Sequence, residues 1–407
     1  MKDIAALFIL CLWLSCSAAC INTITLAEAT PTATTKSPPL PTATMLPEAT
    51  SNVEKTAELS DPRFISQTLP FHLAAIAAAD FDNDGHQDLV GAAEPQLIIF
   101  RGDGQGGLAD FERVPGGKQP NDFALTDLDG DGDVDIVVAN HDTDYLTILL
   151  GDGRGAFAPA SNSPLRIDVR PHPHAVRAAD LDGDGYVELI VDHREGEGLL
   201  ILRGLGDGRL ETPGTLIVGS GDPYLGMAVG DLNGDGKLDL VTPNPGDVGV
   251  LLNTSDTEIA FTLAAPVSAE SPFAVALGDF NGDGRLDLLT ASGEGSPLVE
   301  LFWGNGRGGF EEADGSPFHL APGGKQMAVG DFNGDGLADA AVVSYQATDV
   351  LLLLGGRDAI QLDSLPGGEH PWGLAVADLN EDGKDDLVIA DDAGPQTTVY
   401  LSINPGK

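Results

Sequence analysis

Short apolar runs separated by turn-forming residues recur along most of this chain. Residues 238–242, 249–252, 261–263 and 273–278 form four such runs, with Pro, Gly, Asn and other polar residues between them. Short stretches of Val, Leu, Phe and Thr that are bounded by turn formers are typical of β-strands. The sequence therefore predicts a unit of four short strands. The small side chains of 273–278 favour a crowded position near a central axis for the innermost strand.

An acidic loop of nine residues follows the innermost strand of each unit, and it returns seven times. The loops start at Asp80, Asp127, Asp180, Asp231, Asp279, Asp331 and Asp378, at intervals of 47 to 53 residues. A period near fifty residues indicates a solenoid, propeller or array. Seven four-stranded antiparallel units at this spacing predict an all-β, seven-bladed β-propeller. The 52 glycines and 27 prolines leave little room for helices.

The two ends of the repeat region complement each other. The last unit has strands at 387–390 and 398–401 but no run that could serve as its fourth strand. Residues 63–68 form a β-prone run that precedes the first inner strand and belongs to no unit. We predict that this N-terminal strand completes the last blade and closes the ring.

Residues 1–60 differ in composition from the rest of the chain. After Lys2, residues 4–19 are almost continuously apolar, which predicts a signal peptide over 1–19 rather than a membrane span. The small residues before Cys20 resemble the lipobox of bacterial lipoproteins, in which that cysteine is acylated; simple secretory cleavage is the alternative. Residues 20–60 are rich in Thr, Pro, Ala and Ser and predict a disordered tether. The propeller is expected over 61–407.

These segments predict a secreted or cell-surface protein of a bacterium, held at a membrane only through a lipid anchor at Cys20. The three cysteines are Cys11, Cys16 and Cys20, so the propeller has no disulfide bond. The formal net charge of −42 argues against nucleic acid as a partner.

The acidic loops share the pattern D-x-[DN]-x-D-G-x-x-[DE]. Positions 1, 3, 5 and 9 supply side-chain oxygens, position 7 accepts any residue because only its carbonyl would take part, and Gly at position 6 permits a sharp turn. Carboxylates this close repel one another unless a hard cation lies between them. Magnesium requires a smaller octahedral cage, and zinc, copper and iron prefer His or Cys, so we predict up to seven structural Ca²⁺ ions.

The candidate metal ligands follow from this pattern. Position 1 is Asp80, Asp127, Asp180, Asp231, Asp279, Asp331 and Asp378; position 3 is Asp82, Asp129, Asp182, Asn233, Asn281, Asn333 and Asn380. Position 5 is Asp84, Asp131, Asp184, Asp235, Asp283, Asp335 and Asp382; position 7 is His86, Asp133, Tyr186, Lys237, Arg285, Leu337 and Lys384. Position 9 is Asp88, Asp135, Glu188, Asp239, Asp287, Asp339 and Asp386.

The loops, the inner-strand pattern of residues 273–284 and the glycine-rich turns at 102–107, 151–157 and 304–310 resemble FG-GAP or VCBS-type repeats. Such repeats build the propeller of integrin alpha chains and of many secreted bacterial proteins. The resemblance implies that the calcium ions are structural and that a partner binds the face opposite the calcium loops. Glu188 and Glu381 depart from the family pattern, so we expect unusual calcium affinity in their loops.

The side chains before each inner strand and in the turns between the second and third strands are the candidates for that opposite face. They are residues 120–123, 171–174, 223–225, 272–273, 325–326 and 371–373, with Asn140, His141, Asp142, Tyr145, His193, Arg194 and Tyr345. Aromatic and polar side chains of this kind suit an extracellular protein or glycan ligand. Alternatively, the Pro-aromatic pairs only begin the inner strands and pack between blades.

No catalytic motif is present. The glycine-rich turns follow a third strand and open no helix, so they are not dinucleotide sites, and the histidines form no recognisable metal set. We therefore predict a monomeric adhesion or ligand-binding module without enzymatic activity. A polysaccharide-acting lyase or hydrolase on the same scaffold is the alternative, because fold alone does not exclude catalysis.

Overall fold

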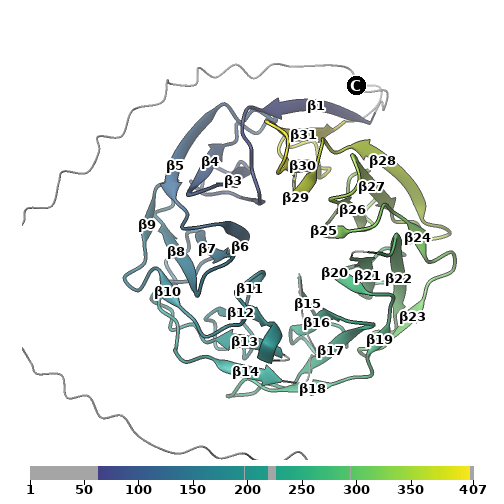
Figure 1. The fold of residues 1–407 in the computed structure, drawn as a ribbon, viewed down its shortest axis with the longest axis horizontal. Coiled ribbons are helices and arrows are strands. Elements are labelled where there is room, and N and C mark those ends of the chain that lie inside the picture. The colour runs from purple at the N-terminus through teal and green to yellow at the C-terminus, as the bar shows by residue number, and fades with distance from the viewer. Residues whose placement is uncertain (1–62, 197, 219–225, 294, 404–407) are drawn as a thin grey trace, which may run out of the picture. The chain divides into compact units, whose positions relative to one another are not determined.

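Small antiparallel sheets surround a central axis in the computed structural model (Figure 1). The structure describes residues 63–403, except 197, 219–225 and 294. The predicted signal peptide and tether therefore lie outside the described residues. Within the described part of the chain there are seven such sheets and no α-helix, which confirms the seven-bladed propeller. None of the described elements is a helix long and apolar enough to cross a membrane.

The blades follow one another along the chain. The first three contain β2 (Ile76–Ala79), β3 (Asp88–Ala93), β4 (Gln96–Arg101) and β5 (Asp110–Pro115); β6 (Pro120–Thr126), β7 (Asp135–Asn140), β8 (Tyr145–Gly151), β9 (Phe157–Pro159) and β10 (Leu165–Arg166); and β11 (Val176–Ala179), β12 (Glu188–His193), β13 (Gly198–Leu202) and β14 (Thr215–Val218). The next two contain β15 (Ala228–Gly230), β16 (Asp239–Asn244), β17 (Asp247–Asn253), β18 (Phe261–Leu263) and β19 (Val267–Ser268); and β20 (Pro272–Gly278), β21 (Asp287–Ser292), β22 (Leu298–Gly304), β23 (Phe310–Glu312) and β24 (Phe318–His319). The last two contain β25 (Gly324–Gly330), β26 (Asp339–Ser344), β27 (Asp349–Leu354) and β28 (Gln361–Pro366); and β29 (Pro371–Ala377), β30 (Asp386–Asp391), β31 (Thr397–Ser402) and β1 (Phe64–Leu69). A short 3₁₀ helix, η1, spans Arg194–Gly196.

Blades 2, 4 and 5 depart from the simple four-stranded plan in their outermost strand. In each, two short segments pair with the same third strand, as β9 and β10 both do with β8. The outer edge of these blades is therefore broken into two pieces. The predicted four-stranded unit is otherwise observed, with β16 and β17 extending a residue or two beyond the predicted runs.

The ring is closed by strands from opposite ends of the described chain. β1 pairs antiparallel with β31 over six residues, from Phe64 opposite Ser402 to Leu69 opposite Thr397. The amide of Ile403 extends this pairing by donating to the Arg63 carbonyl at 2.8 Å. The strand predicted from residues 63–68 thus occupies the fourth position of the last blade, as expected.

The hydrophobic core consists of seven layers between neighbouring blades instead of one central mass. Each layer is a cluster of buried residues from two adjacent blades. Position 2 of every acidic loop enters one of these layers: the residues are Phe81, Leu128, Leu181, Leu232, Phe280, Phe332 and Leu379, all at most 4% exposed. The acidic loop therefore carries its own apolar anchor.

The glycine-rich turns also join blades. The Gly106 amide donates to the Leu379 carbonyl of the preceding blade at 2.8 Å, and Gly308 does the same to Leu232 at 3.0 Å. Gly106 has a φ of +82°, and a Cβ there would lie 2.4 Å from the Leu401 side chain. These glycines let one blade approach the next closely enough for a backbone hydrogen bond.

Candidate calcium loops and ligand cavity

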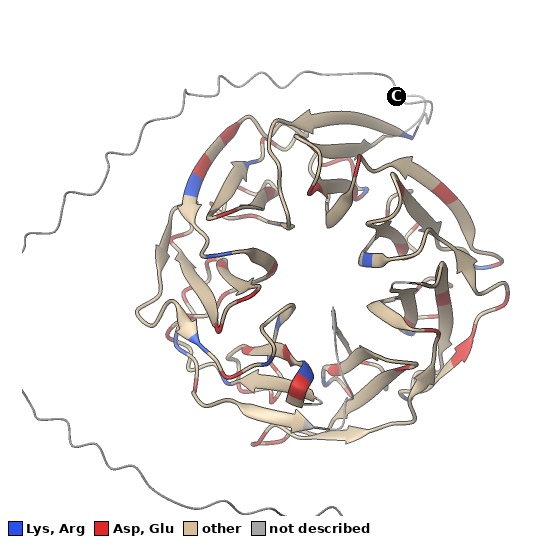
Figure 2. Ribbon diagram, in the orientation of Figure 1, with Lys and Arg blue, Asp and Glu red and all other residues tan. Residues whose placement is uncertain are grey.

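Each acidic loop joins the first and second strands of its blade. Position 1 directly follows the first strand, as Asp127 follows β6, and position 9 begins the second strand, as Asp135 begins β7. Seven loops with this geometry lie at the same end of the inner strands, and Figure 2 shows acidic residues in every blade.

The carboxylate at position 1 organises the turn. In the second loop, Asp127 accepts hydrogen bonds from the amides of Gly130 and Gly132, at 2.7 and 2.9 Å. Gly132 has a φ of +93°, and a Cβ on this residue would meet no atom within 4 Å, so the backbone conformation and not lack of space calls for glycine. The side chain at position 5, Asp131, then accepts from the Asp133 amide at 2.9 Å.

Position 9 has a structural role that the sequence interpretation did not include. Asp135 is fully buried, and its two oxygens accept hydrogen bonds from the amides of Leu128 and Gly151, both at 2.8 Å. Asp287 makes the equivalent pair with Phe280 and Gly304, at 3.1 and 2.8 Å. The position 9 carboxylate thus joins the acidic loop to the third strand, while the other carboxylates of the loop face the loop interior.

Burial of these carboxyl groups shifts their pKa upward. Burial raises the pKa of Asp135 and Asp287 to about 6, and that of Asp339 and Asp386 to about 7. Nearby loop carboxylates act in the same direction, and the backbone hydrogen bonds oppose the shift. The raised pKa values thus reflect acidic side chains that lie close together where little water reaches them.

The first three loops fit a hard cation. In each, three carboxylates place oxygens within 4.8 Å of one another: Asp80, Asp82 and Asp88; Asp127, Asp129 and Asp131; Asp180, Asp182 and Glu188. One oxygen of Asp80 and one of Asp82 are buried without a hydrogen-bond donor among the described residues. A buried oxygen without a donor costs free energy that a bound Ca²⁺ would offset.

Loops four to seven carry Asn at position 3, which supplies an amide oxygen in place of a carboxylate. Asn233 and Asn281 turn this oxygen toward the amide of position 5, at 2.9 and 2.8 Å. Asn333 and Asn380 direct their amide nitrogen at the position 9 carboxylate, at 3.1 and 3.3 Å. At positions 1, 3, 5 and 9 these loops therefore carry three carboxylates, whereas the first three loops carry four.

Contacts between loops link neighbouring blades on this face. The Asn83 amide nitrogen donates to Asp133 at 2.7 Å, which joins the first loop to the second. Glu381 of the last loop contacts His86 of the first and raises the pKa of this histidine. Glu381, which departs from the family pattern, thus takes part in closing the ring.

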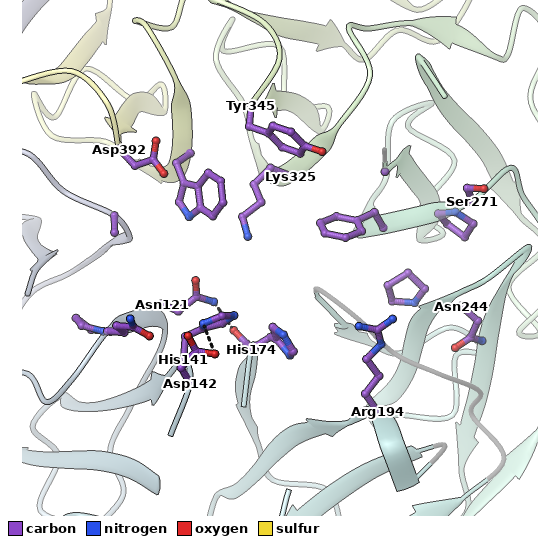
Figure 3. A pocket seen from close by; sticks show the side chains of 18 of the residues that line it. Asn121, His141, Asp142, His174, Arg194, Asn244, Ser271, Lys325, Tyr345 and Asp392 are labelled. Atoms are coloured by element: carbon purple, nitrogen blue, oxygen red, sulfur yellow. Dashed lines mark hydrogen bonds and ion pairs between the residues drawn. The ribbon is translucent and has the colours of Figure 1, made fainter. Parts of the chain in front are cut away.

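A cavity of about 960 Å³ lies at the opposite ends of the inner strands. Residues from all seven blades line it: Ala74, Glu94, Gln119, Pro120, Asn121, His141, Asp142, His174, Arg194, Pro243, Asn244, Pro245, Ser271, Pro272, Phe273, Gly293, Lys325, Tyr345, Trp372 and Asp392. The cavity therefore surrounds the central axis of the propeller. Figure 3 shows Tyr345 and Lys325 across the cavity from Asn121, His141 and His174.

The candidate residues before the inner strands fall into two groups in the structure. Trp372 and Phe273 are half-buried and line the cavity, whereas Phe123 is buried between two blades. Asn140 is also fully buried, and its amide donates to the Gly116 carbonyl at 3.0 Å. Tyr224 lies outside the described residues.

The sequence interpretation missed several cavity residues. Asn244, Ser271 and Asp392 line the cavity but were not among the candidates. For Asn244 the available signal was a polar residue at the end of a second strand, after a run of apolar residues. Polar residues at or next to the end of other second strands hold the loop before the inner strand, as Asp192 does for His174 and Asp391 does for His370.

Lys325 projects into the cavity beside an aromatic ring. Its ammonium nitrogen lies 4.0 Å from the centre of the Trp372 ring. Burial lowers the pKa of Lys325 to about 8, and the carboxylates of Asp122 and Asp392 partly offset this effect. The Trp372 ring in turn stacks on His370, with ring centres 5.6 Å apart. The cavity thus presents a cation and an aromatic surface together.

Three histidines meet at the rim of this cavity. His141 comes from the turn between β7 and β8, and His172 and His174 come from the loop before β11. Each offers a ring nitrogen within 4.8 Å of the others. Sequence interpretation missed this cluster because His141 is 31 residues from His172 and only the packing of two blades joins them. Burial, reinforced by the neighbouring imidazoles, lowers the pKa of His141 to about 4 and also lowers that of His172.

The fold and its acidic loops define a repeat-built β-propeller, and comparison of the sequence with protein families agrees. The model of the FG-GAP-like repeat matches residues 80–138, 127–191, 194–242, 233–290 and 279–342, and that of the FG-GAP repeat matches 370–402. The chain belongs to the FG-GAP repeat family, which confirms the resemblance seen in the sequence. A search of curated proteins finds no match.

Solved structures share the fold at low sequence identity. A lectin from Agrocybe aegerita that recognises non-reducing terminal N-acetylglucosamine is 18% identical, with a TM-score of 0.54 over 83% of this chain and 86% of the lectin. BBS1N, determined in complex with ARL6DN, is 13% identical, with a TM-score of 0.59 over 84% and 97%. A functionally unknown protein from Desulfotomaculum acetoxidans DSM 771 is 15% identical, with a TM-score of 0.53 over 81% and 96%. At these identities the likeness shows the fold alone.

Proposed function

We propose that this protein is an exported, calcium-stabilised propeller that binds a carbohydrate in the axial cavity without catalysis. The cavity carries the proposal, because it presents Phe273, Tyr345 and Trp372 together with hydrogen-bonding groups such as Asn121 and Asn244. An aromatic face packs against the apolar face of a sugar ring, while amide and charged groups bond its hydroxyls. The lectin from Agrocybe aegerita, which recognises a terminal N-acetylglucosamine, shows that a similar fold is compatible with a sugar ligand.

The arrangement of the two sites supports a division of labour. Each inner strand begins at the cavity and ends at an acidic loop, as β6 does between Pro120 and Asp127. The calcium loops would therefore fix the blades from one face, and the opposite face would remain open to the ligand. Three carboxylates at each of the first three loops provide the oxygen donors that calcium requires.

Trp372→Ala is expected to weaken glycan binding about 10- to 100-fold, because central aromatic side chains carry a large share of binding free energy. The ligand would be found on a glycan array in millimolar CaCl₂, and its affinity would be measured by calorimetry. Tyr186→Ala is the matched control, since Tyr186 is an exposed aromatic side chain on the acidic-loop face. Equal affinity in both variants would place the ligand elsewhere, and turnover of a bound glycan would contradict a role without catalysis.

Attachment to a membrane through Cys20 is a further part of the proposal. In a bacterial host, the full chain should incorporate a labelled fatty acid and stay with the membrane fraction. Cys20→Ser should remove the label and release the protein, because this thiol is the proposed acylation site. Cys16→Ser is the control and should change neither result; a labelled Cys20→Ser protein would disprove the anchor.

A further inference from the structure

We propose that His141, His172 and His174 form a zinc(II) site at the rim of the axial cavity. Each offers one ring nitrogen, and these nitrogens lie within 4.8 Å of one another. The site is separate from the acidic loops, which lie at the other ends of the inner strands. Imidazole nitrogen is a preferred zinc ligand, whereas calcium takes oxygen, so the two ions would not compete for the same residues.

The distance between the Nε2 atoms of His141 and His172 is close to the distance between two nitrogen ligands of a zinc ion. The Nε2 atoms of His141 and His172 are 3.1 Å apart. Two nitrogens of a tetrahedral zinc site, each about 2.0–2.1 Å from the metal, lie about 3.3 Å apart. The two blades therefore already hold these atoms near the required separation.

Carboxylates on the far side of the rings favour the tautomers that a metal needs. An Asp142 oxygen lies 3.3 Å from Nδ1 of His172 and 3.5 Å from Nδ1 of His141. A proton on both Nδ1 atoms leaves the two Nε2 lone pairs facing each other, which is unfavourable unless a cation lies between them. A carboxylate that accepts from the second nitrogen of a ligating histidine is the usual outer partner in zinc sites.

Asp192 orients His174 as the third candidate zinc ligand. It is 3% exposed, and its Nδ1 lies 2.9 Å from an oxygen of Asp192. The other Asp192 oxygen accepts from the amides of His174 and Ala175, both at 2.8 Å. The bond to Asp192 places the proton of His174 on Nδ1 and the lone pair on Nε2, as for the other two rings.

The local charge and the open side of the three-histidine site also suit a zinc ion. Asp142 and Asp192 provide two negative charges close to the rings, which offset the nearby positive charges of Arg194 and Lys325. His141 and His174 line the cavity, so the fourth position of a tetrahedral zinc would face it. That position would take a water or an oxygen of the bound ligand.

The test is titration of the whole protein with ZnCl₂ in millimolar CaCl₂, so that calcium saturates the acidic loops. We expect one Zn²⁺ per chain by calorimetry, and with CoCl₂ the visible absorption of tetrahedral cobalt. His172→Ala should remove both signals. Asp142→Asn should weaken zinc binding about 10- to 100-fold, as loss of an outer-shell partner does.

The controls separate this site from others. His319→Ala changes an exposed histidine on the outer strand β24 and should leave zinc binding unchanged. Thermal melts without zinc should show that His172→Ala and Asp142→Asn are folded; if His172→Ala is not, Asp142→Asn alone decides. Zinc binding that persists in a folded His172→Ala protein, an unchanged zinc affinity in Asp142→Asn, or displacement of zinc by calcium would each overturn the proposal.

Discussion

Deletion of residues 63–70 is expected to abolish cooperative folding of the propeller. The deletion removes β1 and with it the buried side chains of Phe64 and Leu69, which are 5% and 1% exposed. Burial of each large apolar side chain contributes about 1.5–3 kcal/mol, and six residues of strand pairing are lost as well. The sum approaches the total stability of a typical domain, about 5–15 kcal/mol.

The deletion should be compared with a circular permutant that keeps every strand. In it, a two-residue Asn-Gly turn joins residue 403 to residue 63, and the chain runs from 71 to 403 and then from 63 to 69. This connection is short because Ile403 already bonds to Arg63. Thermal melts in calcium should show the permutant near the intact protein and the deletion without a transition. A deletion that melts like the intact protein would contradict closure by β1.

Removal of calcium is expected to lower the melting temperature by about 7–17 °C. Extracellular calcium modules bind at about 10⁻⁴–10⁻³ M, so 2 mM calcium stabilises the folded form by about 0.6–1.8 kcal/mol for each occupied loop. Seven loops together would contribute roughly 5–12 kcal/mol, most of the stability of a typical domain. The melt would be measured in excess EGTA and again after calcium is restored.

The controls for this prediction lie within a single loop. Asp279→Asn removes a position 1 carboxylate, whereas Arg285→Ala changes only an exposed position 7 side chain. Asp279→Asn should bind one calcium ion fewer, so its unfolding free energy should rise less steeply with calcium concentration. Arg285→Ala should keep the calcium dependence of the intact protein. Magnesium at the same concentration should not restore the melt, because it does not fill a flexible all-oxygen cage. An unchanged melt in EGTA would contradict structural calcium.

Much of the fold could be predicted from the sequence because its determinants are local and repeated. Short strands, turn formers and loops at a fixed period define each blade without any knowledge of its neighbours. The closing strand was predictable because residues 63–68 had no partner in the chain order. Residues at position 2, such as Phe280, act between blades, and nothing in the local pattern says which neighbour they contact.

The cavity and the histidine cluster were harder to predict because they depend on how the blades are placed around the axis. His141 and His172 belong to different blades, and only the packing of the blades brings them together. The sequence predicts only a metal-binding role for position 9, because one of its two backbone partners lies in the third strand; for Asp135 this partner is Gly151, 16 residues away. Spacing within a loop carries no information about such contacts.

A crystal structure of the protein grown in millimolar CaCl₂ tests the central claim most directly. The account predicts density for a metal in the acidic loops, strongest in the three loops that have Asp at position 3, with oxygens about 2.3–2.6 Å from each ion. Loops that contain only water, with position 1 and position 3 carboxylates turned to solvent, would contradict it.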